Sequence, residues 1–125
     1  MSIHNAIASV AVRDLKVASL WYERLFGRAA DSRPMSEVAA WKFEGGGWLQ
    51  VYQLPERAGK GSVTLAVSNL KQQIGDLKKF GIAAGDPVRT ANVNVIMVKD
   101  PDGNSIAFVE PIDPSDKPQA AGGNL

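Results

Sequence analysis

The chain has 125 residues, with 14 basic and 13 acidic side chains and a formal net charge of +1 at pH 7. This length suits one domain that buries roughly two-thirds of the surface of its unfolded chain, and the balanced charge argues against a nucleic acid partner. The absence of Cys excludes disulfides, thiolate metal sites and cysteine nucleophiles. No stretch approaches the ~18 apolar residues of a membrane span, and the first residues do not resemble a signal peptide. We therefore expect a cytoplasmic protein with no membrane partner.

The first predicted elements are a strand and a helix. Residues 7 to 12 are apolar and strand-like, and Asp14 is a good N-cap for a helix over residues 15 to 26. Apolar side chains recur along this helix at intervals of three and four residues, which is typical of an amphipathic helix. This spacing predicts that Trp21 and Tyr22 belong to the core.

Two strands and a tight hairpin are predicted next. Residues 38 to 43 and 48 to 52 are rich in apolar and aromatic side chains, and three consecutive glycines separate them. We expect Trp41 and Phe43, on one face of the first of these strands, in the core or at an interface.

The second half of the chain follows the same plan. Residues 63 to 67 are predicted to form a strand, and Asn69 to cap an amphipathic helix. Residues 93 to 98 and 106 to 109 are predicted strands. Between them, residues 100 to 103 read Asp-Pro-Asp-Gly, a combination typical of a turn.

The two halves are copies of one module. Residues 11 to 16 return as residues 66 to 71, with Ala-Val, then Asp or Asn, then Leu-Lys at matching positions. Each helix ends at a Phe-Gly pair, and a repeat of one supersecondary unit indicates two paired modules. Each module reads as βαββ, with one further short strand expected near Arg33 and near residues 87 to 89. The sequence predicts one domain over residues 1 to 111, with modules at about 3 to 54 and 61 to 111, a linker at 55 to 60 and a mobile tail at 112 to 125.

Residues 100 to 110 resemble the closing hairpin of the vicinal oxygen chelate superfamily, which includes glyoxalase I, bleomycin resistance proteins and extradiol dioxygenases. The opening segment from Val12 to Lys16, the aromatic pair in the first helix and its Phe-Gly end are also similar to that family. The resemblance spans about residues 3 to 111. It implies an α+β fold in which two βαβββ modules form a cupped mixed or antiparallel sheet, with helices outside and a ligand inside the cup.

The resemblance also implies where a metal would bind. In metalloenzymes of this family, four residues chelate a divalent ion that polarises the substrate. The matching positions here hold Ile7, Gln50, Ser62 and Ala107. Aliphatic side chains donate nothing to a metal, so we expect no metal and no cofactor, and we assign no catalytic residue. The single His, His4, is predicted to be exposed and to face away from Ile7.

Alternation along the strands predicts a ligand-binding face. If the four family positions point into the cup, residues two apart along each strand share that face, and the opposite faces are almost uniformly apolar. Trp48 and Tyr52 offer flat surfaces for stacking, although Trp48 has packing against a loop or a partner chain as an alternative role. The predicted ligand-binding residues are Ile7, Ser9, Trp48, Gln50, Tyr52, Ser62, Thr64, Ala107 and Val109.

Together these observations favour a non-catalytic protein that binds or sequesters a small, partly aromatic organic molecule without a metal. A homodimer is expected, because association would complete the cup and cover the exposed sheet edges. The first alternative is a lyase, isomerase or dioxygenase of the same superfamily, with a divalent metal held by non-standard ligands or by the partner chain. The second alternative is a structural or regulatory domain whose aromatic face meets another protein.

Overall fold

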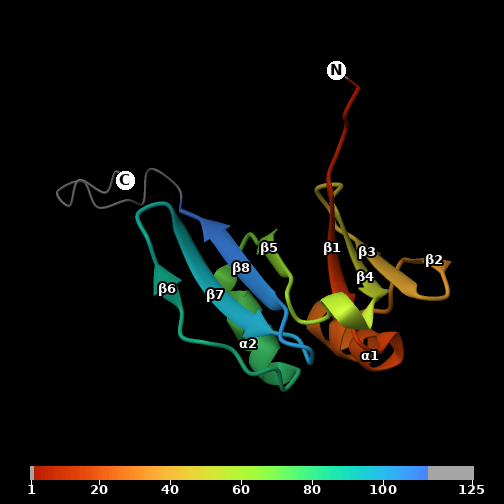
Figure 1. The fold of residues 1–125 in the computed structure, drawn as a ribbon. Helices are drawn as coiled ribbons and strands as arrows, with labels where there is room; N and C mark the ends of the chain where they lie inside the picture. The colour runs from red at the N-terminus through yellow and green to blue at the C-terminus, as the bar shows by residue number, and fades with distance from the viewer. Residues whose placement is uncertain (1, 113–125) are drawn as a thin grey trace. The chain divides into compact units, whose positions relative to one another are not determined.

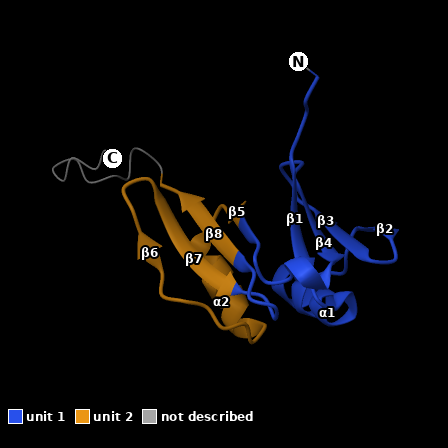
Figure 2. Ribbon diagram, viewed as in Figure 1, with its two compact units in different colours: residues 1–63, 99–105 blue, residues 64–98, 106–125 orange. Residues whose placement is uncertain are grey.

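The computed structural model describes residues 2 to 112 and divides the chain into two compact units (Figures 1 and 2). Of the described residues, 2–63 and 99–105 form unit 1, and 64–98 and 106–112 form unit 2. Each repeat has the βαβββ order, including the short additional strand that the sequence predicts. The predicted tail lies outside the described residues, apart from Ile112. No helix within residues 2 to 112 is long and apolar enough to cross a bilayer.

The first repeat forms a four-stranded mixed sheet in the order β1-β4-β3-β2. β1 pairs with β4 in parallel, whereas β3 pairs antiparallel with both β4 and β2. Gly46, with a φ of 101°, lies in the turn between β3 and β4. The bounds are β1 Ile7–Val12, α1 Leu15–Phe26, β2 Ser32–Met35, β3 Val38–Lys42 and β4 Trp48–Gln53.

The core of unit 1 lies between α1 and one face of this sheet. Tyr22 and Trp41 are fully buried, with ring centroids 6.0 Å apart. Phe26 extends the aromatic cluster, with its ring centroid 5.5 Å from Trp41 and 5.4 Å from Phe43. Core positions for Tyr22 and Trp41 are thus confirmed. Phe43 joins the cluster but is only half-buried, and Trp21 is also half-buried and packs edge-on against Tyr22.

The second repeat forms a sheet in the order β5-β8-β7-β6. The side chains of Leu70 and Leu77 on α2 are buried, as are those of Ile96 on β7 and Phe108 on β8. The predicted linker contains a short 3-10 helix, η1. The bounds are η1 Pro55–Arg57, β5 Ser62–Ala66, α2 Leu70–Lys79, β6 Val88–Arg89, β7 Val93–Lys99 and β8 Ser105–Pro111.

The two helices begin with the same contacts. Asp14 accepts hydrogen bonds from the amides of Lys16 and Val17, and Asn69 accepts one from Gln72, as the sequence predicts. A second contact was not predicted. The last strand of each repeat supplies an oxygen to the first helical amide, with Leu15 N 2.9 Å from Gln53 Oε1 and Leu70 N 3.2 Å from Glu110 Oε2. A helix leaves its first amides without internal partners, so these side chains satisfy groups that the helix itself cannot.

A buried carboxylate organises the turn that belongs to unit 1. Asp100 is 4% exposed, and its Oδ1 accepts hydrogen bonds from the backbone amides of Asp102 and Asn104, both at 2.9 Å. Its Oδ2 accepts from the Tyr22 hydroxyl at 2.8 Å and from Asn104 Nδ2 at 2.7 Å. Asn104 in turn donates to the Ala11 carbonyl at 2.8 Å and accepts from the Gly61 amide at 2.7 Å. The turn is therefore bonded to α1, β1 and the segment before β5.

Removing the Tyr22 hydroxyl should destabilise the protein. In Tyr22→Phe the Asp100 carboxylate keeps its burial and loses a donor, and such a loss costs about 1–3 kcal/mol. We expect a decrease of that size in the free energy of unfolding, measured by urea denaturation. Tyr52→Phe is the matched control, because the Tyr52 side chain is only half-buried. Equal losses in the two variants would contradict the assigned role of the Tyr22–Asp100 bond.

The same tyrosine predicts a loss of stability in alkali. Burial, followed by the charge and hydrogen bond of Asp100, raises the pKa of Tyr22 above its usual value of 10.0. The unfolded chain therefore loses this proton above about pH 10 while the folded chain retains it, so stability falls by up to about 1.4 kcal/mol per pH unit. Because Tyr22→Phe lacks this titration, the stability difference between wild type and variant should narrow above pH 10. Urea denaturation at a series of pH values measures this difference in the free energy of unfolding. A difference that stays constant above pH 10 would argue against a raised pKa of Tyr22.

Candidate functional site

Strand β4 separates two kinds of side chain. Leu49 and Val51 are fully buried on the face that α1 covers. Trp48, Gln50 and Tyr52 alternate with them on the opposite face and are half-buried. Alternating residues of a strand point to opposite faces, so the three share one surface. This face combines two aromatic rings with an amide, which is the mixture expected where a small organic molecule binds.

Strand β1 adds two of the predicted residues to this face. In the parallel pairing, Ile7 lies beside Trp48, and Ser9 lies beside Gln50. Ser9 Oγ is 3.5 Å from Gln50 Oε1. Ile7 is 55% exposed, so its side chain supplies accessible apolar surface next to the Trp48 ring. Five of the nine predicted residues are thus brought together on unit 1; we refer to Ile7, Ser9, Trp48, Gln50 and Tyr52 as the β4 face.

Lys42 also belongs to the β4 face, although the alternation along the strands does not predict it. It is paired with Trp48 across the β3–β4 hairpin, and its Nζ is 5.9 Å from the centroid of the Trp48 ring. This distance is within the range of a cation–π contact. The signal that could have found it is the antiparallel register across the glycine turn, which places Lys42 opposite Trp48.

The backbone of Lys42 is held by the segment between α1 and β2. Its amide donates to the Asp31 carboxylate at 2.7 Å, and its carbonyl accepts a hydrogen bond from the Arg28 guanidinium. Arg28 also forms an ion pair with Asp31. The hydrogen bond from Arg28, followed by that from the Lys42 amide, lowers the pKa of Asp31 below its usual value. Asp31 therefore stays ionised at neutral pH and maintains the bonds that position Lys42.

The other four predicted residues lie on the second sheet. Ser62 and Thr64 alternate along β5 and are exposed, whereas Val109 on β8 is half-buried. Ala107, also on β8, is buried, with 7% of its surface exposed. Their part in ligand binding stays a prediction.

The four residues that the family resemblance assigns to metal positions do not fit a divalent ion. Ile7 and Ala107 carry no donor atom, and the amide of Gln50 and the hydroxyl of Ser62 are neutral. Divalent ions in proteins are held by imidazole nitrogen, thiolate or carboxylate oxygen, with neutral oxygens in support. Within residues 2 to 112, no group of three His, Cys, Asp or Glu side chains could hold a metal ion. His4 is exposed, as the sequence predicts.

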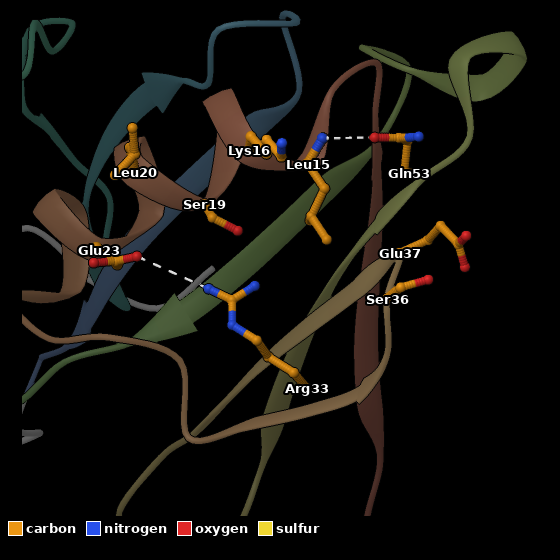
Figure 3. A pocket seen from close by; sticks show the side chains of 9 residues that line it. All are labelled: Leu15, Lys16, Ser19, Leu20, Glu23, Arg33, Ser36, Glu37 and Gln53. Carbon is orange, nitrogen blue, oxygen red and sulfur yellow. Dashed lines mark hydrogen bonds and ion pairs between the residues drawn. The ribbon is translucent and has the colours of Figure 1, made fainter.

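A cavity of about 600 Å³ lies elsewhere on unit 1, between α1 and the segment from β2 to β3 (Figure 3). We call it the α1 cavity. The sequence does not predict it, because its walls come from α1, β2 and β4, which lie far apart along the chain. Its principal lining residues are Leu15, Ser19, Glu23, Arg33, Glu37 and Gln53.

Solved structures of other proteins share this fold. A glyoxalase/bleomycin resistance protein from Catenulispora acidiphila is 34% identical, with a TM-score of 0.78 over 85% of this chain and 96% of that one. An antibiotic binding protein from a Streptomyces strain is 24% identical, with a TM-score of 0.77 over 90% and 99% of the two chains. A bleomycin-binding protein solved in complex with bleomycin is 20% identical, with a TM-score of 0.72 over 86% and 98%.

Neither a scan against protein-family models nor a search of curated proteins finds a match to the sequence. At 34% identity over nearly the whole of the other chain, the Catenulispora protein is similar in sequence as well as in fold. The Streptomyces and bleomycin-binding proteins show the shared fold alone.

Proposed function

Because the chain belongs to the glyoxalase/bleomycin resistance protein family of the vicinal oxygen chelate superfamily, we propose that it binds and sequesters a small, partly aromatic organic molecule without a metal. The observation that carries the proposal is the alternation along β4. It leaves Trp48, Gln50 and Tyr52 partly accessible on the face opposite the helix, while Leu49 and Val51 complete the core. Two neighbours named for binding an antibiotic and bleomycin share the fold and support this class of function.

The β4 face has the chemistry to hold a planar molecule. An aromatic pair contributes about 0.5–1.5 kcal/mol beyond the burial of its area, and Trp48 and Tyr52 each offer a ring for stacking. Gln50 and Ser9 supply hydrogen-bonding groups that orient a ligand. Lys42 places a positive charge beside Trp48, which favours ligands with an anionic substituent on the ring system.

Metal independence rests on the donor set described above. At the four positions that the resemblance assigns to metal ligands, Ile7 and Ala107 offer no donor, and Gln50 and Ser62 offer only neutral oxygens. A Lewis-acid mechanism of the family type therefore lacks the ligands that would hold its metal. Stacking and hydrogen bonding are then the means of retaining the ligand, and sequestration needs no chemical step.

The active form is proposed to be a homodimer. In the part of the chain that the structure describes, β1 has a hydrogen-bonded neighbour on one side only, and so does β5 in its own sheet. An edge strand presents unpaired amide and carbonyl groups that association with another copy would satisfy. Pairing along these edges extends the sheet that carries the β4 face.

Replacing Trp48 tests the proposed site directly. We expect Trp48→Ala to weaken binding of anilinonaphthalene sulfonate, a planar aromatic anion, by about tenfold or more, which corresponds to about 1.4 kcal/mol. The measurement is a titration followed by probe fluorescence, with circular dichroism to check folding. Trp21→Phe is the matched control, because Trp21 lies on α1 and its replacement keeps an aromatic ring against Tyr22. Unchanged binding in Trp48→Ala would refute the assignment of the site to this face.

Metal analysis tests the proposal that ligand binding needs no metal. Protein purified without chelator is expected to contain far less than one Zn, Ni, Mn or Fe per chain, and a chelator should leave binding of the probe unchanged. Elemental analysis and a repeated titration measure the two quantities. Stoichiometric metal accompanied by metal-dependent turnover would instead establish a superfamily enzyme with non-standard ligands.

A further inference from the structure

We propose that the α1 cavity is a second binding site, separate from the β4 face, for a small zwitterion with an aliphatic group: an aliphatic amino acid or dipeptide. Ligand sites in proteins usually have volumes of about 300–1,000 Å³, and this cavity, at about 600 Å³, falls within that range. All of its lining residues belong to unit 1. The proposal does not depend on the function assigned to the β4 face.

The first support is an unsatisfied hydroxyl. Ser19 is 4% exposed, and no residue within 2 to 112 forms a hydrogen bond with its Oγ. Figure 3 shows this hydroxyl directed from α1 toward the region of the cavity where the Arg33 guanidinium lies. Leaving a buried hydroxyl unpaired costs about 1–3 kcal/mol, and such groups are rare in native structures. A polar atom of a bound molecule would provide the missing partner.

The second support is the balance of charge around the cavity. Two cations, Lys16 and Arg33, and two carboxylates, Glu23 and Glu37, line it. A ligand with a single charge could pair with only one sign of this set, whereas a zwitterion can pair with both. The carboxylate of the ligand would contact Arg33 or Lys16, and its ammonium group would contact Glu23 or Glu37.

The guanidinium of Arg33 retains the capacity to bind. Its Nη2 is 4.0 Å from Glu23 Oε2, well beyond the 2.7–2.9 Å typical of a charge-assisted hydrogen bond. The Arg33 side chain is also 52% exposed. Its donors are therefore available to a carboxylate, which the planar guanidinium can bind through two parallel hydrogen bonds.

The aliphatic part of the ligand has its own contacts. The buried side chain of Leu15 lines the cavity, and Leu20, which is 64% exposed, adds apolar surface. Gln53 holds the Leu15 amide through its Oε1 at 2.9 Å, which leaves its side-chain NH2 group free for a ligand carbonyl. A peptide bond supplies such a carbonyl, and this favours a dipeptide over a single amino acid.

The test is an NMR titration of the full chain with leucyl-leucine. We expect saturable amide shifts in α1 and in residues 33 to 37, with the β4 amides of Trp48 and Gln50 unaffected. N-acetyl-leucyl-leucine, which lacks the ammonium group, and leucyl-leucinamide, which lacks the carboxylate, should each bind about tenfold more weakly. Absence of saturable shifts, or shifts confined to the β4 face, would overturn the proposal. Equal binding of all three peptides would overturn the assignment to a zwitterion.

Two variants separate a binding role from a structural one. Arg33→Gln should weaken leucyl-leucine about tenfold, whereas Arg57→Gln, an exposed residue of η1 outside the cavity, should bind like wild type. Ser19→Ala should weaken binding while the melting temperature stays the same or rises, because the variant removes an unsatisfied hydroxyl. Wild-type affinity in both Arg33→Gln and Ser19→Ala would refute the site. A lower melting temperature in Ser19→Ala would show that the hydroxyl has a partner within the protein. The Ser19 hydroxyl would then no longer support a ligand in the cavity.

Discussion

A carboxylate that is removed from water needs compensation for nearly all of its lost hydration, and Asp100 obtains it from four hydrogen bonds. Two of these bonds come from its own turn, and the other two come from the side chains of Tyr22 and Asn104. The Asn104 side chain in turn donates a hydrogen bond to the Ala11 carbonyl and accepts one from the Gly61 amide. The helix, the first strand and the turn of unit 1 are thus held by one set of polar contacts, which the apolar core could not orient by itself because hydrophobic packing has no direction.

The two repeats share individual contacts as well as sequence. In both halves the first helical amide, that of Leu15 or Leu70, is held by a side-chain oxygen near the end of the last strand of the same repeat. The residues that provide it, Gln53 and Glu110, differ in charge but reach the same group. Each repeat therefore fastens its helix to its own sheet. Gln53 has an additional place in unit 1, because it also lines the α1 cavity.

The elements followed from local signals, and this is why the sequence predicted them well. Caps such as Asp14 and Asn69, the glycine hairpin and the alternation along β4 act over a few residues, so their effect can be read without the fold. The shared face of Ile7, Ser9, Trp48, Gln50 and Tyr52 followed from the same alternation combined with the family resemblance. Features that join distant segments were missed: Lys42 depends on hairpin register, the partners of Asp100 lie up to 78 residues away, and the α1 cavity needs three elements to form its walls. Residues of the second sheet, such as Thr64, stay predictions.

The alternation of β4 has a consequence for how proteins of this kind change over generations. Leu49 and Val51 are constrained by the fold, because replacing them with smaller residues would open cavities in the core. Trp48, Gln50 and Tyr52 stand between and beside them in the chain but make their contacts on the other face, where substitutions usually have small effects on stability. Neighbouring residues of β4 are thus subject to different constraints: one set must preserve the core, and the other set is free of that requirement. Substitutions at these three positions can therefore change the chemistry of the β4 face one residue at a time while the core beneath α1 is retained.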